Sequence, residues 1–126
     1  MRYLVNFIIL IAIINTTYGK RTEASWYGEE TQGYMANGIW YDPNALTCAS
    51  WDYTLGTLLL VRAVQSSRSV VVEVTDRGPA KRLHARGRTI DLSRAAFERI
   101  GELSRGLLEI EIVDAIEPAK PITYYK

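Results

Sequence analysis

The segment SVVVEVTDRGP, Ser69–Pro79, combines a strand with the turn that ends it. Its run of β-branched residues is typical of a β-strand. Asp76 then stands at the end of that strand, just before a Gly-Pro turn. Functional sites are often built at strand ends and in the loops that follow them, so Asp76 is a candidate catalytic acid. The alternative is a turn-forming Asp that accepts backbone N–H groups from Arg-Gly-Pro.

Four further segments have the pattern of strands, and one has the pattern of a helix. In GLLEIEIVDA, 106–115, aliphatic and acidic residues alternate, which predicts a half-buried strand. The other predicted strands cover residues 23–28, 57–64 and 86–92. Ser93 predicts the start of a helix, and Gly101 predicts its end in a left-handed conformation. Short strands, many turn signals and one helix favour a mainly β fold, a small barrel with a helix on its side.

Residues 1–19 are predicted to be a secretory signal peptide outside the folded domain. Arg2 precedes the apolar run YLVNFIILIAII, and small and polar residues follow it. The run is short for a membrane span and contains Asn6, although an uncleaved membrane anchor is the alternative. We place the cleavage after Gly19, the domain at residues 20–116 and a flexible tail at residues 117–126.

Charge and cysteine content argue against several classes of protein. Residues 1–19 hold one basic residue and no acid, so 14 of the 15 Lys and Arg remain against 14 Asp and Glu. A neutral exported domain is unlike a nucleic-acid binder. A single cysteine cannot form an internal disulfide. Because no cysteine lies near the predicted cleavage point, we expect no lipid anchor there. One Cys and one His without clustered acids argue against a zinc site, and we expect no metal or cofactor.

Other candidate residues lie around these turns. Asp91 follows the predicted strand at 86–92, and two carboxylates at neighbouring strand ends suit acid–base work on a glycosidic bond. Its alternative role is to help cap the following helix. Seven aromatic residues fall between residues 26 and 53, and such rings suit sugar faces. We expect at least half of them to be structural, with Trp40 and Trp51 exposed.

The segment RGPAKRLHARGR, 77–88, is rich in arginine and lysine. A basic loop beside aromatic residues could hold anionic groups on a polymer, and a solvated loop is the alternative. His84, the only histidine, is expected to be solvated rather than catalytic. Cys48 has no histidine nearby in sequence, which disfavours a thiol nucleophile.

Five stretches together resemble a known family. ASWYG, ANGIWYDPNALTCAS, LGTLLLV, VVVEVTDRGP and RTIDLSRAAFERIG stand in the order of the RlpA-like (rare lipoprotein A) proteins. The resemblance covers about Ala24 to Val113, and TDRGP and IDLSRAAF are its most specific parts. It implies a six-stranded double-psi β-barrel with one or two short helices, related to expansins and barwin-like endoglucanases.

The resemblance also implies a function. Active members of the family look like lytic transglycosylases, which cut peptide-free glycan strands of peptidoglycan and leave 1,6-anhydro ends. The implied catalytic residues are Asp76 and Asp91. The implied partner is peptidoglycan or a related wall polysaccharide, for a monomer without nucleic acid or a stable membrane span. The candidate substrate-binding residues are Trp26, Tyr27, Trp40, Tyr41, Asp42, Ser50, Trp51 and Arg77.

This chain departs from the family pattern at two positions. A Glu commonly follows the Ala-Asn-Gly turn, where this chain has Ile39, and a His commonly stands where it has Ser50. Neither residue replaces the missing acid and base. Retained Asp76 favours an exported transglycosylase, and the two departures favour a non-catalytic, expansin-like module that binds or loosens glycan. An inhibitor of the barwin type would need more cysteines.

Overall fold

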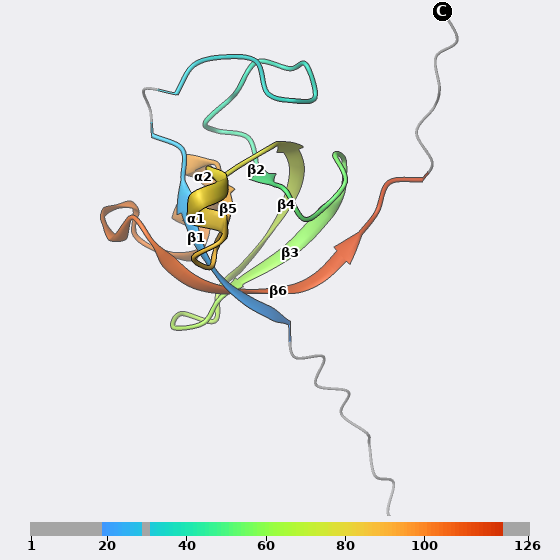
Figure 1. Cartoon of the computed structure of the whole chain (residues 1–126). Helices are drawn as coiled ribbons and strands as arrows, with labels where there is room; N and C mark the ends of the chain where they lie inside the picture. Colours follow the sequence, from blue (N-terminus) through green and yellow to red (C-terminus); the bar gives the residue numbers. More distant parts are fainter. Residues whose placement is uncertain (1–18, 29–30, 120–126) are drawn as a thin grey trace, which may run out of the picture.

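The computed structural model describes residues 19–28 and 31–119 as a closed barrel (Figure 1). In the order β1-β5-β2-β4-β3-β6 each strand hydrogen-bonds to its neighbours, and β6 closes the barrel on β1. The predicted mainly β barrel is therefore confirmed. The predicted signal peptide, apart from Gly19, and the tail beyond residue 119 lie outside the described residues. The strands are β1 (Lys20–Trp26), β2 (Thr47–Ser50), β3 (Leu58–Ala63), β4 (Ser69–Asp76), β5 (Arg88–Leu92) and β6 (Leu108–Ile116).

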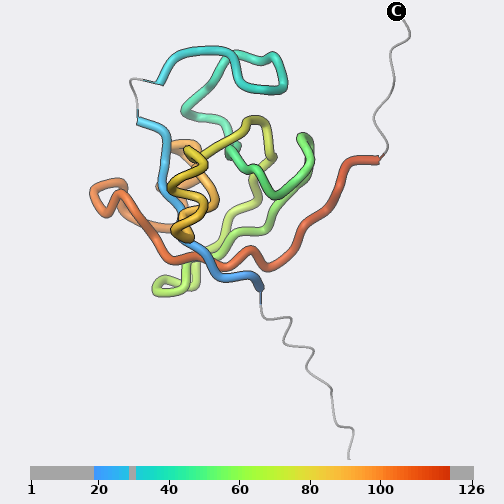
Figure 2. The backbone as a smooth tube through the Cα atoms, in the orientation of Figure 1, coloured from blue at the N-terminus to red at the C-terminus, as the bar shows by residue number. Residues whose placement is uncertain are grey.

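Strand β2 is the element that alternation of residue types did not predict. It has four residues, and its last three, Cys48 to Ser50, are all buried, so no polar face marks it. It runs parallel to β4 and antiparallel to β5, between these two strands. Strands β1 and β5 form the second parallel pair. Two parallel pairs inside one small barrel bring segments far apart in sequence side by side (Figure 2).

Two helices lie on one side of the barrel, α1 (Lys81–His84) against β5 and α2 (Arg94–Ile100) against β4, β1 and β5. A short 3-10 turn, η1 (Leu103–Arg105), follows α2. Ser93 caps α2 as predicted, since its Oγ accepts the Ala96 N–H at 3.2 Å. No helix among the described residues is long and apolar enough to cross a membrane.

The predicted left-handed end at Gly101 is wrong. Gly101 has φ −168°, an extended conformation that any residue can adopt. Its lack of a side chain matters for packing instead, because a Cβ there would lie 2.5 Å from Cδ1 of Leu108. The glycine therefore lets the end of α2 approach the start of β6 closely.

The core lies inside the barrel and follows the alternation of the strands. In β4 the side chains of Val70, Val72 and Val74 are buried, whereas Val71 is 50 % exposed. Phe97 of α2 is fully buried and belongs to the same core cluster. Each such side chain stabilises the fold by roughly 1.5–3 kcal/mol relative to leaving it exposed. Residues next to these buried positions therefore face outward, where a site can form.

Glu111 of β6 departs from the expected polar face, because it is only 6 % exposed. Arg62 of β3 forms a hydrogen-bonded ion pair with its carboxylate, and Arg21 of β1 lies 3.5 Å away. The hydrogen bond from Arg62 is the main cause that holds the Glu111 pKa below its usual value. Three strands are thus connected by one carboxylate.

This ion pair predicts a pH-dependent contribution to stability. Because the folded pKa of Glu111 is lower than the unfolded value near 4.5, the contribution is present above that value and lost as pH falls through the folded pKa. We expect the free-energy advantage of the parent over Glu111→Gln, measured by urea unfolding, to shrink between about pH 7 and about pH 2. The neighbouring control Glu109→Gln should change little, and an advantage independent of pH would contradict the prediction.

Candidate functional site

The candidate site is built on a row of paired residues that crosses four strands of the barrel. Ser25 of β1 pairs with Asp91 of β5, Asp91 pairs with Ala49 of β2, and Ala49 pairs with Asp76 of β4. Asp76 and Asp91 therefore lie on the two sides of β2. Since neighbouring strands are about 4.8 Å apart, their Cα atoms are separated by roughly 10 Å. The register thus brings together the two predicted carboxylates, 15 positions apart in sequence.

Asp76 accepts hydrogen bonds from three different segments. The Tyr27 hydroxyl donates to Oδ2 at 3.1 Å, and the backbone N–H groups of Ala36 and Arg77 donate to Oδ1 at 3.0 and 2.8 Å. The bond from Arg77 is the turn contact that the alternative role predicted. The other two bonds, to residues 40 and more positions away, show that Asp76 also organises long-range structure. Its half-buried carboxylate is held in one orientation at the end of β4.

Asp91 is held by its neighbours on β1 and β5. The Ser25 hydroxyl hydrogen-bonds to Oδ1, and Arg88 Nη2 lies 3.3 Å from the same oxygen. The side chain of Asp91 is 13 % exposed. The expected alternative, capping of α2, is performed by Ser93 instead. Asp91 is thus a shielded, ion-paired carboxylate.

Gly78 lies between the two carboxylate positions. A Cβ at Gly78 would be 3.3 Å from Cβ of Ala49, 3.6 Å from Oδ2 of Asp91 and 3.9 Å from the Tyr27 hydroxyl oxygen. The Gly-Pro turn therefore folds back over β2, and small residues at both contact positions make the close approach possible.

Tyr27 connects the two sides of this arrangement. Burial is the main cause that raises its pKa far above the usual tyrosine value, and the nearby carboxylate of Asp76 adds to this effect. The phenol consequently stays protonated and serves as a donor. Its ring packs against Tyr41, 5.1 Å between centroids. Tyr41 is 5 % exposed, so it supports Tyr27 from inside.

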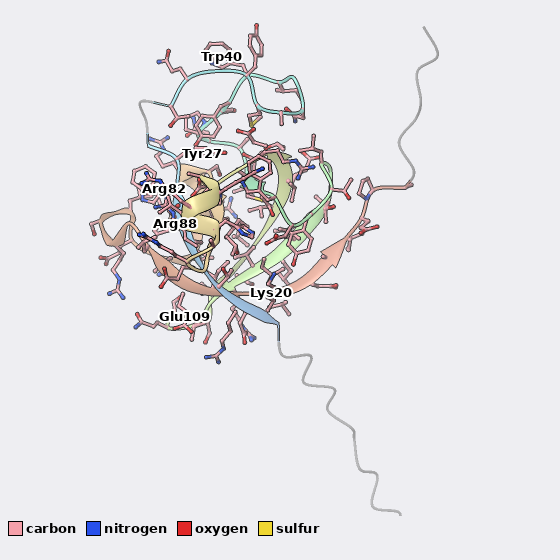
Figure 3. All side chains as sticks on the ribbon, in the orientation of Figure 1. Lys20, Tyr27, Trp40, Arg82, Arg88 and Glu109 are labelled. Carbon is pink, nitrogen blue, oxygen red and sulfur yellow. The ribbon has the colours of Figure 1, made fainter. Side chains whose placement is uncertain are left out.

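The loop of residues 33–41 lies next to Asp76 and carries exposed aromatic residues. It is anchored by Ala36 on Asp76 and by the Asn37 N–H, which donates to the Thr75 carbonyl at 3.1 Å. Trp40 is 53 % exposed, as predicted, and Figure 3 shows it at the far end of the molecule from Glu109. Tyr34, which the sequence did not single out as a site residue, is 76 % exposed and meets Trp40 edge-to-face at 5.0 Å.

Other predicted residues take different positions. Trp26 packs against Phe97 and donates to the Leu103 carbonyl, so it belongs to the core side of β1. Asp42 forms a local turn by accepting the Asn44 N–H at 2.9 Å. Ile39, at the position of the family Glu, is 62 % exposed on the loop beside Trp40.

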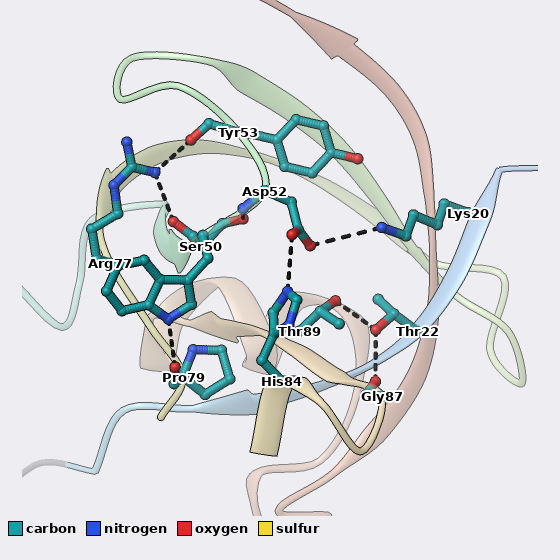
Figure 4. A network of polar contacts seen from close by, with 11 residues as sticks. Lys20, Thr22, Ser50, Asp52, Tyr53, Arg77, Pro79, His84, Gly87 and Thr89 are labelled. Carbon is teal, nitrogen blue, oxygen red and sulfur yellow. Dashed lines mark hydrogen bonds and ion pairs between the residues drawn. The ribbon is translucent and has the colours of Figure 1, made fainter. Parts of the chain in front are cut away.

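Arg77, Ser50 and Trp51 form the opposite border of the site. Arg77 Nη1 donates to the carbonyls of Ser50 and Tyr53 at 2.8 and 2.6 Å, so its guanidinium fixes the segment after β2 (Figure 4). Ser50 is 1 % exposed. Trp51 is 43 % exposed, as predicted, and its Nε1 donates to the Pro79 carbonyl at 2.7 Å.

His84 is paired rather than simply solvated. Its Nε2 lies 2.9 Å from Oδ1 of Asp52, whose other oxygen lies 3.7 Å from Nζ of Lys20 (Figure 4).

The described residues offer little support for a thiol nucleophile or a metal site. Cys48 is fully buried, and burial raises its pKa well above the usual thiol value. Among the described residues no three of His, Cys, Asp and Glu are grouped as metal ligands would be.

The closed six-stranded barrel, with Asp76 at the end of β4 and Asp91 on β5, has the architecture of a double-psi β-barrel. A family profile described as lytic transglycolase matches residues 20–112. The chain therefore belongs to the RlpA-like family.

Curated relatives agree with this assignment. The endolytic peptidoglycan transglycosylase RlpA of Yersinia pestis is 40% identical over 92 residues, which are 72% of this chain and 24% of that protein. The protein of the same name from Vibrio cholerae is 37% identical over 102 residues, 79% of this chain and 37% of that protein. The chain thus spans about a quarter to two fifths of the length of these relatives.

Two solved structures share the fold. The Streptomyces papain inhibitor superposes with a TM-score of 0.56 at 24% identity, over 78% of this chain and 98% of its own. A mutant expansin of Clavibacter michiganensis in complex with cellohexaose gives a TM-score of 0.56 at 22% identity, over 81% of this chain and 54% of the expansin chain. At these identities the likeness concerns the barrel alone.

The Tyr27–Asp76 hydrogen bond predicts a measurable loss of stability in Tyr27→Phe. The ring contact with Tyr41 is kept, but Asp76 loses one of its three donors, which costs about 1.5–3 kcal/mol for a bond to a charged group. Urea unfolding should detect this loss. The control Tyr34→Phe, at an exposed phenol, should stay within about 0.5 kcal/mol of the parent. Equal effects of the two substitutions would show that the bond to Asp76 contributes nothing.

Proposed function

We propose that this protein is a peptidoglycan lytic transglycosylase that acts outside the cytoplasm. The observation that carries the proposal is Asp76, a half-buried carboxylate held by three hydrogen bonds beside a loop with exposed aromatic rings. Family membership and the activity named for the relatives support the same reaction class. An exported protein, as residues 1–19 predict, would meet this substrate in the cell wall.

The reaction needs one proton donor and one proton acceptor, but no water. In the proposed step Asp76 donates its proton to the glycosidic oxygen as the bond from C1 to that oxygen breaks. The 6-hydroxyl of the same sugar then attacks C1 and returns a proton to Asp76, which closes the 1,6-anhydro ring. One carboxyl group can perform both transfers in succession. The enzyme therefore ends the cycle in the state in which it began.

Asp91 and Tyr27 are positioning residues in this proposal. Asp91 is paired with Arg88 and Ser25, so its orientation is fixed next to the Gly78 turn. Tyr27 donates to Asp76 Oδ2 and leaves Oδ1 to the two backbone donors. A preorganised environment of this kind stabilises charge that develops during the reaction.

A second candidate function is glycan binding without cleavage, as an expansin-like module. It is favoured by Ile39 on the loop of residues 33–41, at the position where family members commonly have a Glu. Together with Tyr34 and Trp40 this side chain makes an exposed apolar surface that suits the face of a sugar ring. Ser50 adds to the argument, because a buried hydroxyl cannot serve as the missing base.

Substitution of Asp76 tests the reaction. The chain from residue 20 on is incubated with amidase-treated peptidoglycan, and anhydro-muropeptides are measured by mass spectrometry. We expect product from the parent and a loss of at least about 100-fold in Asp76→Asn, since acid–base catalysis contributes about 10²–10⁴-fold. Asp114→Asn, at an exposed position of β6, is the matched control and should keep its activity. Binding of the glycan by the parent without any product would favour the expansin-like module instead.

Substitution of Ile39 tests whether the missing acid on the loop of residues 33–41 limits the rate of the reaction. Ile39 is exposed, so Ile39→Glu places a carboxyl group on the loop next to Asp76 without disturbing the core. We expect the rate of product formation to rise, by up to about the 10²-fold that a positioned acid or base contributes. Ile39→Gln, of the same size without an acid, should not raise it. An unchanged rate in Ile39→Glu would mean that Asp76 works without a partner on this loop.

A further inference from the structure

The segment between β4 and β5 concentrates positive charge. Residues 77–90 contain five basic residues and no acid, although the chain from residue 20 on is formally neutral. Arg77 donates to two backbone carbonyls, and Arg88 pairs with Asp91, so these two are used within the fold. The other three are exposed on α1 and directly after it: Lys81, Arg82 and Arg86.

Lys81 borders the candidate site, and Arg82 and Arg86 are exposed on the same short segment. Residues 77–80 join Asp76 to α1, and the carbonyl of Pro79 in this link accepts the hydrogen bond from Trp51. Nζ of Lys81 lies 4.9 Å from the centre of the Trp51 ring. Figure 3 places Arg82 on the side of the barrel that carries the helices, between Trp40 at one end and Lys20 at the other. The exposed indole and Lys81 thus lie side by side, and Arg82 and Arg86 follow on the same short segment of the chain.

The positive charge of this surface is not compensated locally. Asp52, the acid in the loop after β2, already pairs with His84 and Lys20. Within the described part of the chain, neither Arg82 nor Arg86 has an ion pair. Clustered like charges do not stabilise the compact state, but they do attract a ligand of opposite charge. The arrangement therefore suits an anionic partner.

We propose that Lys81, Arg82 and Arg86 form a subsite for carboxylates on the glycan strand, next to the sugar that stacks on Trp51. The inference rests on the proposed function and identifies the carboxylates of the substrate as the groups that this surface binds. Each muramic acid carries a lactyl group, and its carboxylate is free once the stem peptide has been removed. Guanidinium groups bind carboxylates with two parallel hydrogen bonds, and Lys81 adds a point charge beside the indole.

Binding measurements in an inactive background test the subsite. Asp76→Asn is the parent here, so that strands are bound but not cut, and the ligand is peptide-free glycan in about 50 mM and about 300 mM salt. We expect Arg82→Gln/Arg86→Gln to weaken binding about two- to fivefold per charge, and less at the higher salt. The parent should bind strands with carboxylates reduced to alcohols correspondingly weakly, and the double variant, which keeps only Lys81, should distinguish the two glycans less than the parent does.

Matched variants separate this role from general charge. Arg68→Gln removes one exposed cation on the hairpin between β3 and β4, at the opposite end of β4 from Asp76, and should leave affinity unchanged. Arg82→Lys/Arg86→Lys keeps the charge but not the two parallel hydrogen bonds of a guanidinium, so it should lose less affinity than the double Gln variant. Unfolding midpoints of all variants check that the barrel is intact.

Several outcomes would overturn the inference. Equal affinity for native and carboxyl-reduced strands is one, and an equal loss in Arg68→Gln is another. A loss confined to a phosphate-bearing wall polymer would assign the surface to phosphodiesters instead. The proposed function is judged separately, since absence of anhydro-muropeptides would refute cleavage while carboxylate-dependent binding could persist.

Discussion

The arrangement of the whole site depends on the insertion of one short strand, β2, between β4 and β5. This strand has only four residues, yet it is parallel to one neighbour and antiparallel to the other. Its Ala49 is paired with Asp76 on one side and with Asp91 on the other. A slip of the register by one residue would turn its side chains to the opposite face of the barrel and separate the two acids. The small side chain of Ala49 also leaves room for Gly78 above it.

Much of the fold could be predicted because its signals are local. The alternation of residues in β4 and β6, and the cap at Ser93, appear in the structure where the sequence places them. Strand β2 could not be found in this way, because it is buried on both faces and too short to show a period. The predicted left-handed conformation of Gly101 was also wrong, because the glycine is required by its contact with Leu108, a tertiary contact that no local pattern contains.

The site was predictable to a smaller extent. Asp76, Trp40 and Trp51 could be named from strand ends and turn signals. Sequence could not assign the structural roles of Tyr41 and Arg77, because burial and hydrogen-bond partners depend on how distant segments meet. Tyr34 was overlooked for the same reason, since both its exposure and its edge-to-face contact with Trp40 depend on how the loop folds. The position of Ser50 is informative in another way: with 1 % exposure, it offers little room for the histidine that family members commonly have there.

The contact between Lys81 and Trp51 has a geometric consequence for any ring that binds there. An indole has two faces, and the ammonium group of Lys81 occupies one of them, 4.9 Å from the ring centre. The Nε1 edge is also engaged, through its hydrogen bond to Pro79. A sugar can therefore stack only on the remaining face. The indole is thus a one-sided platform, and a chain that rests on it has a restricted choice of directions in which to continue across the barrel.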